Sequence, residues 1–174
     1  MGKQLVLALF ADEAAADQAV ATLKEWDKLT GQVPLGGIGV LVKDEKGKLK
    51  THKLGARRTA GGAILFGLAA VLTGGTMIGL GLVGGSILGG AFGALFHKGL
   101  KISREDMERL NKELDGGKAA VGVMAEDYQT AATSIKLTEL GGQPEAFEVS
   151  EEALAEAQAA AEAAPDALAD EAGA

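Results

Sequence analysis

The stretch QLVLALFADEAAADQAVATLKEW, residues 4–26, begins with a compact apolar run and then changes to apolar residues at helical spacing. Residues 4–10 are a compact apolar run that ends at an acidic stretch, and such a run predicts a buried strand. Asp12 is then placed as a helix N-cap, after which apolar side chains recur at helical spacing: Ala15, Ala19, Val20, Leu23 and Trp26. We therefore predict a strand over 4–10 and an amphipathic helix over 13–29.

The chain beyond this stretch continues to alternate between strand and helix patterns. A buried apolar strand at 38–42 and a further strand at 49–54, joined by a charged turn, predict a β-hairpin. Ser103 is placed to cap a helix that ends at Gly116. Three further elements come after it, namely a strand at 119–125, a helix at 127–140 that ends at Gly141 and Gly142, and a short strand at 146–149.

The order of these elements predicts an α+β fold. A βαββαβ order is typical of a ferredoxin-like sandwich, in which residues 1–58 and 99–149 form the body. Residues 59–98 interrupt the body as an apolar insert, and residues 150–174 form an acidic Ala/Glu tail with an extra C-terminal helix. Because the insert lies between the third strand and the second helix, we expect its two ends to emerge near each other on one side of the sheet.

The insert is apolar over most of its length. Residues 60–96 carry no charged side chain and include 12 of the 26 glycines. A helix needs about 20 residues to cross the hydrocarbon core of a bilayer, so this segment is long for one span and short for two. TGGT at 73–76 is the expected break, which leaves arms of about 14 and 21 residues. We predict a helical hairpin, inserted into lipid or buried between subunits.

Small residues recur within the second arm at four-residue spacing. A glycine costs about 1 kcal/mol relative to alanine in a water-exposed helix. In an apolar environment the helix is enforced, because unpaired backbone groups cost more there. Small residues four apart then let a second helix approach closely. The predicted helix-packing residues of this glycine zipper are Gly81, Gly85, Gly89 and Gly93, with Ser86 and Gly90 in a second row.

Basic residues flank the insert on both sides. Residues 46–58 hold six Lys or Arg and no acidic residue, and further basic residues occur at 97–104. This arrangement predicts an inner-membrane protein with its body and both hairpin ends in the cytoplasm. Such clusters also attract anionic head groups. The candidate head-group residues are Lys48, Lys50, His52, Lys53, Arg57, Arg58, Lys98 and Lys101. The alternation of Lys48, Lys50 and His52 equally suits a solvated strand face.

Several functions are disfavoured by composition. The chain has no cysteine and two histidines, so thiolate metal sites are excluded and no metal or other cofactor is expected. Neither His52 nor His97 has a catalytic partner at a recognisable spacing, so we expect no enzyme. Aromatic residues make up 4% of the chain, which argues against nucleic-acid binding. Of the 24 acidic residues, 7 lie in the tail, and no basic residue accompanies them.

Three stretches carry a resemblance to a known family. In these stretches, and in the glycine-rich stretch before the third, the chain resembles the DUF1269 family of bacterial predicted membrane proteins. The three stretches are LVLALFADEAAADQAVATLKE, IGVLVKDEKGKLKTHKL and ISREDMERLNKELDGGKAAVGVMAED. The resemblance covers roughly residues 3–149 and leaves the tail outside. It implies membrane association and supplies no activity or catalytic residue.

These observations lead to one functional expectation and two alternatives. We expect a membrane-associated homo-oligomer whose hairpin inserts into lipid or packs between copies, with a bilayer or bound phospholipid as partner. The first alternative is a soluble cytoplasmic scaffold or particle that buries the hairpins in a protein-only core. The second is a small-ligand sensor, which rests on analogy with other ferredoxin-like bodies.

Overall fold

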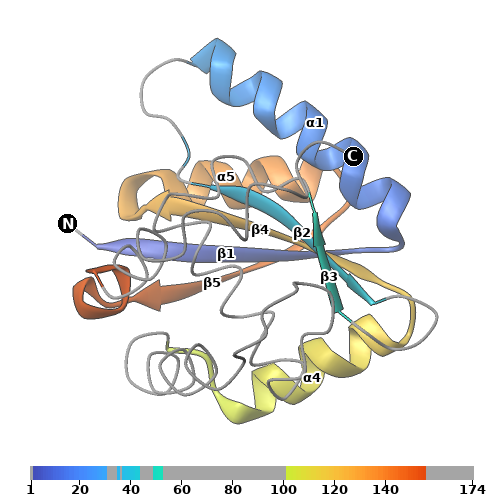
Figure 1. Cartoon of the computed structure of the whole chain (residues 1–174). Helices are drawn as coiled ribbons and strands as arrows, with labels where there is room; N and C mark the ends of the chain where they lie inside the picture. The colour runs from blue at the N-terminus through green and yellow to red at the C-terminus, as the bar shows by residue number, and fades with distance from the viewer. Residues whose placement is uncertain (1, 31–34, 36, 44–48, 53–100, 156–174) are drawn as a thin grey trace, which may run out of the picture.

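A computed structural model describes residues 2–30, 35, 37–43, 49–52 and 101–155, and for 49–52 only the backbone. The fold is α+β, as predicted. The described residues form five strands, which are β1 (Lys3–Phe10), β2 (Ile38–Lys43), β3 (Leu49–His52), β4 (Ala119–Glu126) and β5 (Gln143–Val149). They form one sheet in the order β3-β2-β4-β1-β5, and every neighbouring pair is antiparallel (Figure 1). The three labelled helices are α1 (Glu13–Thr30), α4 (Arg104–Asp115) and α5 (Asp127–Glu139).

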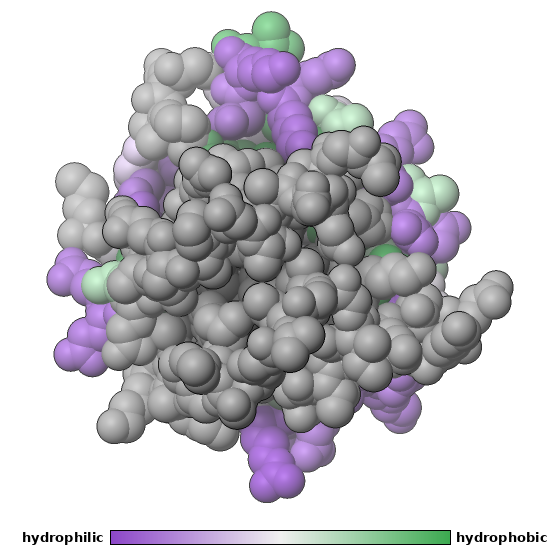
Figure 2. Space-filling view, viewed as in Figure 1, coloured by the Kyte–Doolittle hydropathy of each residue, from purple (hydrophilic) through white to green (hydrophobic). Residues whose placement is uncertain are grey.

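The helices form two layers around the sheet. Helices α1 and α5 cover one face, and α4 lies on the other (Figure 1). Successive residues of a strand point to opposite faces, so Val6 and Ala8 enter the core beneath α1 and α5, while Leu5 and Leu7 point to the α4 side. All four are buried. Burial on both faces explains why residues 5–10 are continuously apolar. Around the rim of the molecule most described side chains are hydrophilic (Figure 2).

The predicted helix starts are confirmed by their caps. Asp12 Oδ1 accepts a hydrogen bond from the backbone N–H of Ala15 at 2.8 Å. Ser103 Oγ accepts one from the backbone N–H of Asp106 at 3.0 Å. Each cap satisfies a donor that would otherwise be unpaired in the first helical turn. Ser150 caps in the same way, and residues 151–155 are helical, as expected for the start of the tail.

The strand pairing places the predicted hairpin at one edge of the sheet. The hairpin of 38–42 and 49–54 is confirmed over the described residues, because β2 and β3 are antiparallel neighbours. Strand β3 is an edge strand, and β4 lies between β2 and β1. The physical reason is burial: the first seven of the eight residues of β4 are apolar and buried, whereas LKTH in β3 has the polar content of an edge.

The last strand is longer than its apolar content indicates. We predicted a short strand at 146–149, and β5 runs over Gln143–Val149 beside β1. Its exposed residues include Glu145 and Glu148, and Pro144 lies in it as well. Charged residues and proline are tolerated at the edge of a sheet, where one side of the backbone needs no partner strand.

Gly142 closes the end of α5 against the core. Its backbone N–H donates to Leu137 O at 2.9 Å, and Gly141 before it has a positive φ of 93°, which together form a Schellman motif. A Cβ at Gly142 would lie 2.7 Å from Phe10 Cζ, and Phe10 is 2% exposed. We predict that Gly142→Ala destabilises the fold by about 1–3 kcal/mol through overpacking. Urea unfolding checks this, with Gly116→Ala as the control that loses less; equal losses would contradict it.

Thr133 offers a stabilising substitution in the same helix. Its hydroxyl is buried without a hydrogen-bond partner, whereas Thr130 Oγ1 donates to Glu126 O at 3.1 Å. An unpaired buried polar group costs about 1–3 kcal/mol. We therefore expect Thr133→Val, which keeps the shape of the side chain, to raise the free energy of unfolding by about 1 kcal/mol. Thr130→Val should lower it or leave it unchanged. Thermal melts of both variants decide the matter, and a lower midpoint for Thr133→Val would refute this account.

Candidate functional site

Most residues of the predicted membrane-facing site lie outside the described residues. The predicted role of the central hairpin in helix packing and of its flanks in head-group binding therefore stays a prediction. The residues concerned are Gly81, Gly85, Ser86, Gly89, Gly90, Gly93, Lys48, Lys53, Arg57, Arg58 and Lys98.

Two of the remaining candidates lie in the edge strand β3. Lys50 is the register partner of Val42, and His52 that of Val40. Since the two positions are two residues apart, they share one face of the strand. This confirms the predicted alternation for these two positions. Their contact with head groups stays a prediction.

Lys101 is the first described residue after the insert, and it is attached to the opposite edge of the sheet. Its backbone N–H donates to Glu148 O of β5 at 3.1 Å. Its ammonium also forms an ion pair with the Glu148 carboxylate, although the side chain is 76% exposed. Lys101 thus holds the chain to β5, and its role in binding head groups stays a prediction.

The described residues on either side of the insert are attached to opposite edges of the sheet. Strand β3, which ends at His52, is one outer strand, and β5, to which Lys101 is hydrogen-bonded, is the other. Four inter-strand steps of about 4.8 Å separate the two edges by about 19 Å. The ends of the insert itself, residues 59 and 98, lie outside the described residues, so their expected emergence near each other on one side of the sheet stays a prediction.

Helix α4 is tied to β2 by a lysine that is almost fully covered. Lys43 Nζ donates to Asn111 Oδ1 and forms an ion pair with Asp115, and its side chain is 10% exposed. A charge this deeply covered needs partners of this kind to be tolerated. Beside them, Leu110 and Leu114 of α4 are buried. This contact positions the C-terminal half of α4 on the sheet.

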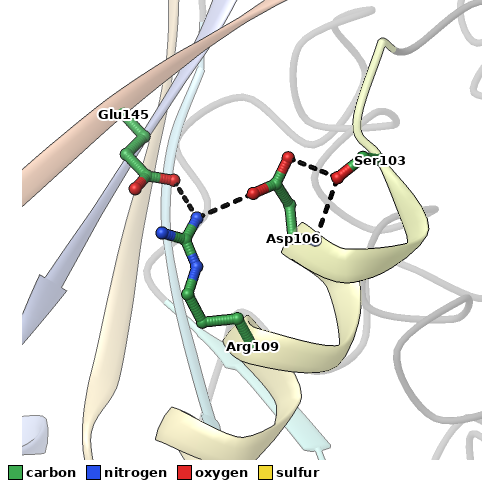
Figure 3. A network of polar contacts seen from close by, with 4 residues as sticks. All are labelled: Ser103, Asp106, Arg109 and Glu145. Carbon is green, nitrogen blue, oxygen red and sulfur yellow. Dashed lines mark hydrogen bonds and ion pairs between the residues drawn. The ribbon is translucent and has the colours of Figure 1, made fainter.

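The first half of α4 is tied to β5 by an arginine between two carboxylates (Figure 3). Arg109 Nη2 lies 2.9 Å from Asp106 Oδ1 and also pairs with Glu145 of β5. Asp106 in turn accepts a hydrogen bond from Ser103 Oγ at 2.7 Å, which joins the cluster to the helix cap. The hydrogen bond from Arg109 to Glu145, and then the charge of that carboxylate, raise the pKa of Arg109. Through these two ion pairs Arg109 joins α4 to β5.

Two ion pairs of α4 join the helix to strands that are distant in the sequence. Residues 43 and 115 are separated by 72 positions, and residues 109 and 145 by 36, so no local pattern predicts either pair. Within the described ranges, no group of three or more metal-ligating side chains is placed to hold an ion. In the same part of the chain, no helix combines the length and apolar character that crossing a bilayer requires.

Lys118, three residues after the end of α4, shifts the pKa of a carboxyl within that helix. Lys118 forms a hydrogen bond and ion pair with Glu113, and this contact lowers the pKa of the Glu113 carboxyl below 4.5. A carboxyl whose pKa is lower in the folded protein than in the unfolded chain stabilises the fold at pH values above its pKa in the unfolded chain. This stability is lost as the pH falls through the pKa that the carboxyl has in the folded protein. We predict that Lys118→Gln raises the pKa of Glu113, measured by NMR titration. An unchanged midpoint would mean that the pair does not form in solution.

Comparison with protein-family models, with curated proteins and with solved structures gives no match for this chain. The resemblance to the DUF1269 family therefore remains an expectation from the sequence. Function is accordingly inferred from the sequence pattern and from the geometry of the α+β body.

Proposed function

We propose that this chain is a non-enzymatic, membrane-associated protein that assembles with copies of itself through a glycine-zipper hairpin at 60–96. The observation that carries the proposal is a charge-free segment with glycines at 81, 85, 89 and 93 and basic residues on both flanks. Helices striped with small residues in this way associate closely in apolar surroundings. The hairpin contacts lipid, or copies of itself, while the α+β body remains in the cytoplasm.

For the body we propose a ferredoxin-like sandwich. Support comes from β1, β2, β4 and β5, which take the order β2-β4-β1-β5 in the sheet. Helix α1 comes after β1, α5 comes after β4, and both lie on one face (Figure 1). Taken together, these elements have the βαββαβ order of that fold. On this interpretation β3 and α4 are additions, and they carry the two ends of the insert.

The basic flanks are proposed to hold the protein at the inner membrane. Lys53, Arg57 and Arg58 precede the apolar segment, and Lys98 comes after it. Each basic residue near an anionic surface contributes about 1 kcal/mol of binding, and a positive charge at both ends favours a cytoplasmic location for both. The resemblance to the DUF1269 family agrees with this placement.

The clamped arrangement of α4 supports a mechanical link between body and hairpin. Lys101 is joined to β5 by a backbone hydrogen bond and an ion pair. Three residues later α4 begins, and this helix forms ion pairs with β5 and β2. Through these ties, a force or displacement at the end of the insert reaches both sides of the sheet. We propose that the body thereby sets the spacing of hairpins in an assembly.

Purification without detergent tests the proposed function. The size of the protein is measured by light scattering, and its phospholipid by phosphate assay after extraction. We expect either a large particle with bound phospholipid or protein in the membrane pellet that detergent releases and high salt does not. A large particle free of lipid would instead support the soluble scaffold. A lipid-free monomer would overturn both assembly hypotheses.

A further inference from the structure

One row of apolar side chains on the α4 side of the sheet is almost completely buried. Leu5 pairs in register with Met124 of β4 and with Phe147 of β5, so these three side chains, here called the Leu5 row, lie side by side across three strands. Leu5 is 0% exposed, Met124 2% and Phe147 8%, all within a single chain. Side chains covered to this extent need a layer of packed atoms above them, and that layer belongs to the same chain.

Helix α4 is held over the neighbouring part of this face. It approaches the sheet most closely at β2, and its ion pairs reach Lys43 at the end of β2 and Glu145 of β5. Glu145 is the register partner of Leu7, which lies two residues along β1 from Leu5 in the direction of Lys43. The buried side chains of α4 are Leu110 and Leu114, both in its C-terminal half. A helix held in this way does not by itself cover the Leu5 row.

The chain leaves β3 and returns to β5 at the end of the sheet that holds the Leu5 row. Strand β3 is antiparallel to β2, so it ends at His52 in the direction of Ile38, whose partner in β4 lies next to the row. At the other edge the backbone of Lys101 is hydrogen-bonded to Glu148, which also lies next to the row. Residues 53–100 therefore connect two edges that adjoin the Leu5 row, while α1 and α5 occupy the opposite face (Figure 1).

A pair of glycines gives this part of the face a floor that another backbone can approach closely. Gly39 of β2 and Gly122 of β4 are register partners, and by strand alternation both lie on the same face as Met124. Glycine inside a strand often marks such a close approach. The apolar row with two glycines beside it therefore suits a helix that lies flat on the sheet.

We propose that the first arm of the insert, residues 60–72, lies across the Leu5 row and covers it. As a helix this arm is about 20 Å long, close to the distance of about 19 Å between the outer strands, and it is too short to cross a bilayer. In helical geometry one side of the arm is mostly alanine, with Phe66 as the exception. The other side holds the large apolar residues Ile64, Leu65, Leu68, Val71 and Leu72, and this side packs on the sheet.

Two other occupants fit the row less well. Residues 156–174 of the tail hold one large apolar side chain, Leu168, and five acidic ones, whose burial would be costly. A second copy is not required, because the row is covered within one chain. The inference does not rest on the proposed function, since the glycine row at 81–93 lies in the second arm.

Photo-cross-linking of the full-length protein identifies the occupant. Phe147→benzoylphenylalanine places a photoreactive ketone in the row, and tandem mass spectrometry of the digested product locates the residue that it captures. We expect capture within 60–72, and in a mixture of isotope-labelled and unlabelled protein both joined peptides should carry the same label. Ala146→benzoylphenylalanine, at an exposed position on the opposite face of β5, should not capture this segment. Capture of another segment, of a differently labelled copy or of nothing would overturn the proposal.

Thiol protection gives a second readout without the large photoreactive group. Met124→Cys should react with maleimide more slowly than Ala21→Cys, which is at an exposed position of α1. Adding Leu68→Asp, on the large side of the arm, should speed the reaction of Met124→Cys about ten-fold, because a charge there detaches the arm. Ala70→Asp adds the same charge on the small side and should leave the rate within about two-fold. Val123→Cys, which faces the core beneath α1 and α5, should respond to neither change.

Two results of the thiol experiment would overturn the proposal. The first is equal acceleration of Met124→Cys by Leu68→Asp and Ala70→Asp, because the large side of the arm would then have no special contact with the sheet. The second is a reaction of Met124→Cys as fast as that of Ala21→Cys in the absence of either charge, because the row would then be open to solvent. Gly81→Leu with Gly89→Leu should leave the protection unchanged, which separates this contact from assembly through the second arm.

Discussion

Replacing Gly81 and Gly89 together with leucine should abolish the large assembly and leave the body folded. Each leucine adds a bulky side chain to a row in which small residues allow a second helix to approach, so close packing is lost. Leucine is also a better helix former than glycine by nearly 1 kcal/mol per site. Loss of assembly could therefore not be assigned to a weaker helix. The measurement is particle mass by light scattering, with circular dichroism as the check on folding.

Gly84→Leu is the matched control for this experiment. It makes the same chemical change within the same segment, but at about 100° per residue position 84 falls outside the row formed by residues 81, 85, 89 and 93. We expect its particle mass to equal that of the unmodified protein, and Gly85→Leu alone to reduce it. If the double variant keeps the original mass, the glycine row is not a packing surface.

Neutralising Lys53, Arg57 and Arg58 with glutamine should weaken binding to anionic vesicles by about 100-fold. Three charges at about 1 kcal/mol each amount to roughly two powers of ten in the dissociation constant. The measurement is sedimentation with vesicles that contain phosphatidylserine, at several salt concentrations. Binding by the unmodified protein should also fall as salt rises, because screening shortens the reach of the charges.

Glutamine at Lys24, Lys28 and Lys112 gives a control with the same change in net charge. These residues lie in α1 and α4, outside the basic flanks at 46–58 and 97–104 in the sequence. We expect this variant to bind within about three-fold of the unmodified protein, since screened charges far from the surface contribute little. Equal weakening by both triple variants would show that net charge governs binding and that the flank has no special role.

Local chemistry accounts for the parts of the fold that the sequence predicts well. Asp12 and Ser103 mark helix starts because a short oxygen-bearing side chain satisfies backbone donors within the next three residues. The glycines at 116 and 141 mark helix ends for a similarly local reason. The central strands are recognisable because burial on both faces requires continuous apolar side chains, as in β1 and β4.

Edge elements and interhelical contacts are less visible in the sequence. Strand β5 has the polar composition of a loop, and only its pairing with β1 along Lys3–Leu9 reveals its full length. Helix α5 contains apolar residues such as Tyr128 and Ile135, but their spacing alone does not tell which side of the helix is buried. That information comes from the burial of Leu137 and Thr133 beneath them.

The sequence by itself determined the α+β class, the bounds of the helices to within a residue or two, and the charge-free glycine-striped insert with its basic flanks. These properties depend on side chains that are close together in the chain. The tertiary structure alone decided that β4 separates β2 from β1, that His52 and Lys101 lie at opposite edges of the sheet, and that Lys43 and Arg109 clamp α4. Those outcomes result from competition among strands for the buried centre, which depends on the whole chain at once.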